Sequence, residues 1–142
     1  MRLVLDTNVV ISALLWGGTP ERLIELAGDG SVELVTSRGL LDELAELLGR
    51  PKLAAKLARD GQSATEIVTR YAQAAEVIEA TPATESGIRD PDDAVVLGCA
   101  IAARAQAIVS GDKDLLSLGV YQEIPILSPT QCLARLSAPP PR

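Results

Sequence analysis

The sequence predicts an α/β fold in which a mostly parallel sheet of four to five strands carries helices on both faces. Short apolar runs of strand character alternate with helical patterns along the chain. Strands separated by helices pair in parallel, because each helix returns the chain to the same edge of the sheet. The length of 142 residues suits one domain with a substantial core.

Helix-start signals divide the first half of the chain. Thr19 as N-cap with Pro20 at the first helical position marks one start. Ser37 caps the helix after the second strand, and Ser63 with Glu66 forms a capping box. In chain order, we expect a strand at 2–6, helices at 8–16 and 19–28, a strand at 32–35, helices at 38–49, 51–61 and 63–75, and a weaker strand at 76–80.

The second half is built around one strongly apolar helix. Asp90 is its expected N-cap and Pro91 its first residue. In chain order, we expect a polar connection at 81–90, this helix through "DDAVVLGCAIAARA", strands at 107–110 and 125–127, and a last helix opened by Ser128 and Pro129. The domain is expected to span residues 1–137, and residues 138–142 to form a disordered tail.

Composition excludes several kinds of chemistry. The chain has no histidine, so Ser-His-Asp and Cys-His catalysis and imidazole zinc sites are unavailable. Proton transfer must fall to carboxylates, Lys, Tyr or metal-bound water. Cys99 and Cys132 are far apart and are expected as reduced core residues of a cytoplasmic protein. No apolar run is long enough to span a membrane.

Two features argue against nucleic-acid binding. The formal net charge is −6, whereas phosphate contacts supply most of such affinity. The only aromatic residues are Trp16, Tyr71 and Tyr121, which argues against a base-stacking platform. The charge argument weakens if several acids share a divalent cation, because the metal reverses the local field.

Acidic residues follow two of the predicted strands, at the edge where parallel sheets bind ligands. Asp6 ends the first strand, and Asp112 follows the strand at 107–110, with Asp114 two residues on. A purely structural role is open for each, since Asp6 can cap a helix and Asp112 can form an Asx turn.

Two helices add acids near the same edge. Glu43 falls at the shoulder of the apolar stripe of its helix, whereas Asp42 and Glu46 point to solvent. Asp92 and Asp93 both lie in the first turn of the apolar helix, and its periodicity does not separate them. Negative charge at a helix start is also favourable by itself.

Four separate segments thus bring carboxylates to one edge of one sheet. Crowded carboxylates repel one another unless a cation lies between them. Oxygen-only ligands favour Mg²⁺ or Mn²⁺, and the number of carboxylates permits one ion or two. With substrate phosphates in its shell, such a site activates water for phosphodiester hydrolysis.

The blocks "LVLDTNVVISALL", "LLDELAELLGRPKL" and "RDPDDAVVLGCAIAARAQAIVSGDKDLLSL" resemble, in order and spacing, a PIN domain nuclease. The kind it resembles is the VapC-like toxin of bacterial toxin–antitoxin pairs, over nearly the whole chain. The resemblance implies a three-layer sandwich and a Mg²⁺- or Mn²⁺-dependent endoribonuclease acting on RNA. It also implies a small antitoxin as partner and a homodimer or higher oligomer.

The resemblance also assigns roles to residues. It implies that the catalytic and metal-binding acids are Asp6, Glu43, Asp93 and Asp112, with Asp114 as a further metal ligand. It thereby selects Asp93, a choice that periodicity leaves open. Asn8 would support the loop at Asp6, and Ser110 keeps a hydroxyl where the family commonly has threonine.

A cluster of positive charge follows the helix of Glu43. It consists of Arg50, Lys52, Lys56 and Arg59. Such a cluster is by default a solvated helix face, and its alternative role is to hold the RNA backbone near the metal, which predicts salt-dependent binding.

Two other functions compete with the nuclease. A receiver-type phosphoacceptor domain also gathers acids around Mg²⁺, but it needs adjacent acids after the first strand and a lysine after the last. Here Asp6 stands alone, and "EIPILSP" has no lysine. A non-catalytic interaction module, in which the acids only cap helices, predicts no metal dependence.

Overall fold

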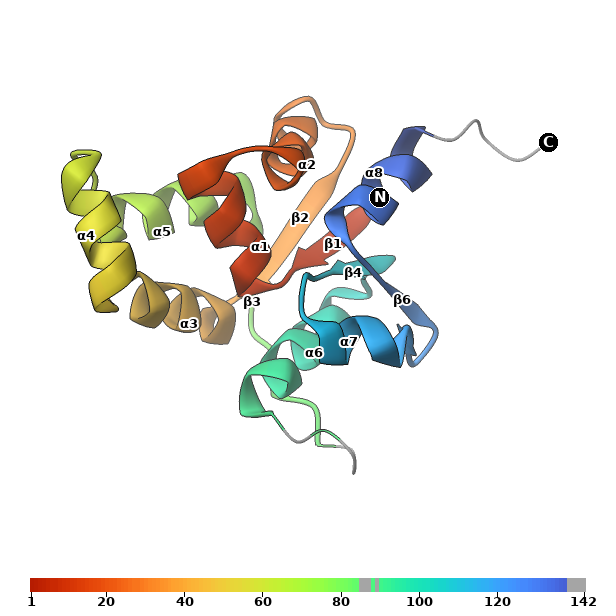
Figure 1. Ribbon diagram of the computed structural model, residues 1–142. Coiled ribbons are helices and arrows are strands. Elements are labelled where there is room, and N and C mark those ends of the chain that lie inside the picture. The colour runs from red at the N-terminus through yellow and green to blue at the C-terminus, as the bar shows by residue number, and fades with distance from the viewer. Residues whose placement is uncertain (85–87, 89, 138–142) are drawn as a thin grey trace.

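The computed structural model describes residues 1–84, 88 and 90–137 and shows a three-layer α/β sandwich (Figure 1). The elements are β1 (Arg2–Leu5), α1 (Thr7–Ile11), the π-helix η1 (Ser12–Trp16), α2 (Thr19–Gly28), β2 (Glu33–Ser37), α3 (Arg38–Leu48), α4 (Pro51–Arg59), α5 (Ala64–Ala74), β3 (Glu76–Ile78), α6 (Pro91–Ala103), β4 (Ala107–Val109), α7 (Lys113–Leu118), β5 (Val120–Tyr121), β6 (Ile124–Leu127) and α8 (Pro129–Ser137). The expected tail at 138–142 lies outside the described residues.

The predicted α/β class with a mostly parallel sheet is confirmed. Among the described residues the sheet has six strands in the order β3-β2-β1-β4-β6-β5. All neighbours pair in parallel except β5, which runs antiparallel to β6. The sixth strand exceeds the four to five expected, because two-residue β5 has no sequence period of its own and depends on pairing with β6.

Two cores lie on opposite faces of the sheet. Along β1, Leu3 and Leu5 face one core and Val4 faces the other, as the alternation of a strand requires. The first core is covered by α1, α2, α4, α5, α8 and most of α3, and the second by α6, α7 and the start of α3. Cys99 and Cys132 are free and buried, as expected from the sequence.

Most of the predicted helix starts are confirmed. Ser37 Oγ accepts a hydrogen bond from the backbone of Leu40 at 3.2 Å, and Ser63 Oγ accepts one from Glu66 at 3.1 Å. Thr19 as N-cap is wrong by one residue, because Gly18 takes that position with a φ of 72°. Only glycine adopts such a conformation without strain. Gly18 is therefore the N-cap, and Thr19 is the first residue of α2.

The helix expected at 8–16 is divided into two parts. After α1, the backbone of Gly17 donates to the carbonyl of Ser12 at 2.9 Å, closing the wide turn of η1. An apolar period does not distinguish this turn from an α-helix, so the sequence gives no sign of it. The π turn ends at two glycines with positive φ, Gly17 and Gly18, and leaves Trp16 on the surface.

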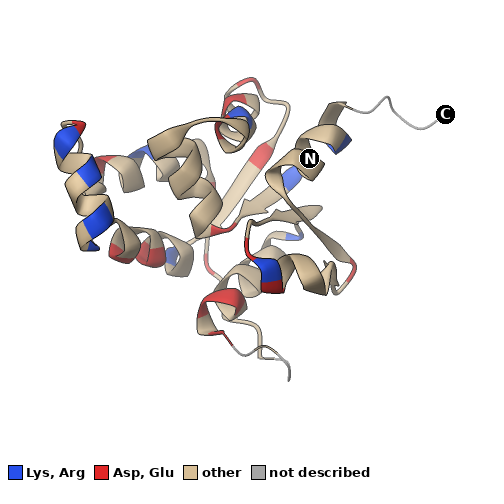
Figure 2. Cartoon of the chain, in the orientation of Figure 1, with Lys and Arg blue, Asp and Glu red and all other residues tan. Residues whose placement is uncertain are grey.

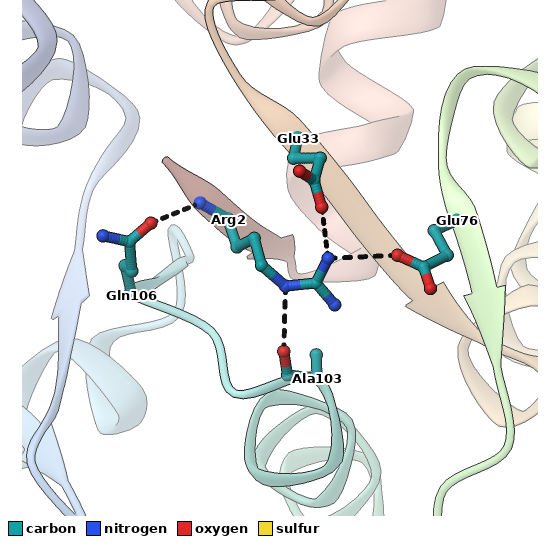
Figure 3. A network of polar contacts seen from close by, with 5 residues as sticks. All are labelled: Arg2, Glu33, Glu76, Ala103 and Gln106. Carbon is teal, nitrogen blue, oxygen red and sulfur yellow. Dashed lines mark hydrogen bonds and ion pairs between the residues drawn. The ribbon is translucent and has the colours of Figure 1, made fainter.

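Arg2 forms a network of polar contacts that joins β1, β2, β3 and α6 at the amino-terminal edge of the sheet (Figure 3). The Arg2 guanidinium pairs with Glu33 of β2 and lies 3.0 Å from a carboxylate oxygen of Glu76 in β3. Its Nε donates to the carbonyl of Ala103, at the end of α6, at 3.0 Å. Acids at this edge are therefore neutralised by a cation within the chain.

Candidate functional site: an acidic edge

Asp6 lies at the centre of the opposite, carboxyl-terminal edge. Its side chain is 9% exposed. Oδ1 accepts a hydrogen bond from the Thr7 backbone at 2.8 Å, and Oδ2 accepts one from the Ser110 hydroxyl at 2.8 Å. The β1–β4 register pairs Leu5 with Val109, which sets Asp6 beside Ser110. Asp6 is therefore both the N-cap of α1 and part of the acidic edge.

Ser110 connects Asp6 to Asp112. The Ser110 hydroxyl, fully buried, accepts a hydrogen bond from the Asp112 backbone at 3.0 Å. Asp112 in turn caps α7, since its Oδ1 accepts from the backbone of Asp114 at 2.7 Å. This chain of contacts fixes the position of two of the predicted acids through backbone groups, so neither depends on a mobile side-chain partner.

Glu43 reaches the same edge from α3. Of the three acids in this helix, Asp42 and Glu46 are exposed and only Glu43 is half-buried, as the position of the apolar stripe predicts. Glu43 Oε2 is buried without a hydrogen bond of normal geometry. Burial, followed by the charges of Asp92 and Asp6, raises the pKa of Glu43 to about 7, although a nearby Thr7 hydroxyl acts in the opposite direction.

The first turn of α6 contributes two further acids. Asp90 caps the helix through the Asp92 backbone at 2.9 Å, as predicted. Burial and the charges of Asp112, Asp90 and Asp6 raise the pKa of Asp93 to about 6. Asp93 is half-buried and Asp92 is exposed, yet Asp92 also acts on the other acids through its charge.

Asp92, which the sequence pattern does not separate from Asp93 and which the family resemblance does not select, also belongs to the acidic edge. Its charge raises the pKa of both Glu43 and Asp6. Asp93 is thus within electrostatic range of Asp112 and Asp6, and Asp92 is within range of Glu43 and Asp6. The available signal was the adjacency of Asp92 and Asp93, which an all-apolar helix cannot resolve into one inward and one outward residue.

Burial is also the main reason that the pKa of Asp6 is raised, and the hydrogen bonds from Ser110 and Thr7 partly oppose it. The charges of Asp112 and Asp92 add to the increase. None of the ion pairs found between described residues involves one of these acids. Unlike the Arg2 edge, this edge carries negative charge that no cation of the described chain neutralises.

The acids are close enough to act on one another electrostatically, but they do not converge on a single position that an ion could occupy. Among the described residues, no three acidic, histidine or cysteine side chains are spaced to hold a metal ion. Separated carboxylates are the arrangement that mutual repulsion favours. The oxygen donors, their uncompensated charge and the unpartnered Glu43 Oε2 nevertheless fit a hard divalent cation in chemistry.

Hollows in the surface adjoin the acids. One of about 260 Å³ is lined by Asp93 and Asp114 among others. A second, of about 290 Å³, lies between Asn8 and Asp112. The exposed Asn8 thus borders the acidic edge, consistent with its expected place beside Asp6.

The predicted basic cluster lies along and before α4 (Figure 2). Arg50 pairs with Glu46 at 3.3 Å, and Lys56 pairs with Asp60 at 3.0 Å. Lys52 and Arg59 are exposed and take part in none of the ion pairs found between described residues. Two of the four cations are thus paired with acids at the surface, and two take part in no ion pair between described residues.

The fold and the acidic edge define an α/β domain that assembles carboxylates from distant segments, a class that includes metal-dependent hydrolases. The sequence profile of the PIN domain family matches residues 2–114, and the chain belongs to this family. The resemblance recognised from the sequence is thereby confirmed. Receiver-type domains are accordingly not the class to which this chain belongs.

The fold is similar to that of one solved structure in particular. A chain in the crystal structure of VapBC2 from Rickettsia felis, bound to a DNA fragment from its promoter, superposes with a TM-score of 0.60. The match covers 89% of this chain and 97% of that chain at 15% sequence identity. At this identity the likeness shows the shared fold. No curated protein matches the chain.

No helix within the described residues has the length and apolar character needed to cross a membrane.

Proposed function

We propose that the protein is a divalent-metal-dependent endoribonuclease and the toxin component of a toxin–antitoxin pair. The observation that carries the proposal is that Asp6, Glu43, Asp93 and Asp112 lie at one edge and form no ion pair with a described cation of the chain. Membership of the PIN family supports nuclease activity. The VapBC2 likeness supports a small antitoxin partner, and by the same resemblance we expect a cytoplasmic homodimer or higher oligomer.

Asp6, Glu43, Asp93 and Asp112 would hold Mg²⁺ or Mn²⁺, with Asp114 beside them. When bound, the ion supplies positive charge for the scissile phosphate and lowers the pKa of a water molecule. Asp6 and Asp112 are fixed by backbone and Ser110 contacts, so they serve to position the ion. Their rigidity limits the reorganisation that binding requires.

Glu43 differs from these two acids in having an oxygen without a hydrogen-bond partner. Its Oε2 is buried at the edge, and its pKa of about 7 lies close to neutral pH. A divalent ion beside Glu43 would lower this pKa, so Glu43 would be charged when the ion is bound and its free oxygen would serve as a ligand.

The test is cleavage of single-stranded RNA by purified protein with Mg²⁺ or Mn²⁺, with EDTA, and in the variants Asp6→Asn and Asp93→Asn. Cleavage is expected with either ion and should be lost on chelation and in both variants. Asp42→Asn, an exposed acid on the helix of Glu43, is the matched control and should retain full activity. Activity that disappears in EDTA but persists in both variants would indicate a contaminating nuclease.

Absence of cleavage under all conditions would instead favour the non-catalytic interaction module. The same assay compares Asp92→Asn with Asp93→Asn. We expect the greater loss for Asp93, because it is half-buried beside Asp112, whereas Asp92 is exposed.

A further inference from the structure

The only tryptophan of the chain lies on the surface beside the basic cluster. Trp16 is 60% exposed at the end of η1. A single exposed apolar side chain needs no explanation by itself. Its surroundings are what distinguish it, because Trp16 lines a groove of about 490 Å³ together with Arg50 and Lys52. We call this hollow the Trp16 groove.

The Trp16 groove leads toward the acidic edge. Asn8 and Ser12 line it, and both also line the hollow that contains Asp112. Asn8 and Trp16 are separated by a little over two helical turns, on the order of 10 Å. A chain bound in the groove would therefore reach the acids without crossing the rest of the surface.

A neighbouring cation contacts the indole. Lys56 Nζ lies 5.2 Å from the centre of the Trp16 ring, within the range of a cation–π contact. Lys56 also pairs with Asp60. The cation lies over the ring, and because Trp16 is 60% exposed, part of the indole stays open to a further contact.

The charges of the groove select an anionic occupant. Arg50 and Lys52 line it, and Lys52 takes part in none of the ion pairs found between described residues. The remaining walls include Ile11, Leu47 and Leu53, which are apolar. An aromatic face, an apolar wall and cations together match a nucleotide, whose base stacks and whose phosphate pairs with arginine or lysine.

We propose that the Trp16 groove binds single-stranded RNA, with one unpaired base stacked on the Trp16 indole and adjoining phosphates held by Arg50 and Lys52. Only an unpaired strand presents a free base face to the ring, so duplex RNA is excluded from this contact. One indole accommodates one base, which agrees with the lack of aromatic residues for a larger platform. The inference rests on the proposed ribonuclease function, because it names how the same site receives its substrate.

Tryptophan fluorescence reports whether the Trp16 groove is occupied, because Trp16 is the sole tryptophan. The protein is titrated in EDTA with short single-stranded RNA while tryptophan emission and RNA fluorescence anisotropy are followed together. Saturable quenching that parallels binding is expected. The same sugar-phosphate chain without bases should not quench. RNA that binds with no change in emission would overturn the proposal.

Variants separate stacking from charge. Trp16→Ala should weaken RNA binding roughly tenfold, the effect of losing one base–aromatic contact, and Trp16→Tyr should recover most of it. Val120→Ala removes side-chain atoms at a similarly exposed position, 55%, on the edge strand β5 and should leave binding unchanged. Equal affinity of Trp16→Ala and the unmodified protein would contradict the proposal.

The charge contribution has a closely matched control. Arg50 and Arg22 are exposed arginines that each pair with a glutamate of a neighbouring helical turn. Arg50→Gln should reduce the dependence of log affinity on log salt by about 0.7, whereas Arg22→Gln should not change it. An equal effect of the two variants would show general electrostatic attraction and would overturn the assignment to the groove.

Two further outcomes distinguish this inference from the function on which it rests. Quenching by RNA in EDTA without any cleavage in Mn²⁺ would support the groove and contradict the nuclease. Cleavage with unaltered binding in Trp16→Ala would support the nuclease and contradict the groove. An emission change on diluting the protein without RNA would show that a second copy covers Trp16, which also overturns the proposal.

Discussion

The hydroxyl of Ser110 donates a hydrogen bond of 2.8 Å to Oδ2 of Asp6 and thereby joins strand β4 to the start of α1. Both residues are buried. This hydrogen bond lowers the pKa of Asp6, whereas burial raises it. Ser110 is thus a positioning residue that favours the charged form of Asp6, the form that a cation would bind.

Replacement of Ser110 by alanine is expected to raise the pKa of Asp6 further and to lower the free energy of unfolding. The expected loss is about 1–3 kcal/mol at neutral pH, since a buried carboxylate loses a donor. Side-chain carboxyl NMR shifts give the pKa, and urea unfolding gives the stability. Thr36→Val is the control, because the Thr36 hydroxyl is buried without a partner and its removal should cost little or nothing.

The raised pKa values of Glu43 and Asp93 predict how stability depends on pH. In the folded state these values are about 7 and about 6, above the 4.5 and 3.8 of unperturbed groups. Protonation therefore favours the folded state, and this contribution is complete at low pH and lost as pH rises through about 6 and then about 7. Without divalent ions, these two groups should make the protein less stable at about pH 8 than at about pH 5.

Glu43→Gln should weaken this pH dependence and stabilise the protein above neutral pH, because the amide carries no charge. Asp42→Asn, on the exposed side of the same helix, should leave the dependence intact. Urea unfolding across the pH range measures both. An unchanged slope in Glu43→Gln would show that Glu43 does not titrate in the way described.

A divalent ion should counteract the loss of stability that raised pH causes. Mn²⁺ binds charged carboxylates, so the rise in melting temperature on adding it should be larger at about pH 8 than at about pH 5. Thermal unfolding with Mn²⁺ and with EDTA measures the difference. Asp6→Asn and Asp112→Asn should reduce the rise, whereas Asp29→Asn, in the turn after α2, should not. An equal rise in all variants would locate Mn²⁺ elsewhere.

Local signals were enough to predict most of the helix starts and the direction of Glu43. The caps Ser37 and Ser63 depend on residues within three positions, and the stripe of α3 repeats over its length, so both are legible in the chain. The six residues of α7 are too few for a period, and Asp112, interpreted as a turn residue, caps them. Such elements are defined by tertiary contacts that one sequence does not display.

The acidic edge followed from topology, because parallel strands place their carboxyl ends together. The topology did not predict the role of Asp92, because that role depends on how α6 is rotated against α3. That rotation is set by close contacts such as the one at Gly39 of α3, where a Cβ would lie 3.1 Å from Val95. Packing distances of this kind have no counterpart in the pattern of apolar residues.

Gly98, in the middle of α6, allows the backbone of residues 81–84 to cross the helix. A Cβ at this position would lie 2.0 Å from the carbonyl oxygen of Thr81 and 3.0 Å from the backbone nitrogen of Ala83. Backbone atoms cannot move aside cheaply, so Gly98→Ala should destabilise the protein by about 1–3 kcal/mol. The crossing segment is tied to α6 by the hydrogen bond from Ala83 N to the carbonyl of Ala94, the residue directly after Asp93, so cleavage should also fall. Gly28→Ala, at a helical glycine with no atom within 4 Å of the new Cβ, should be neutral or slightly stabilising, and urea unfolding of the two variants gives the comparison.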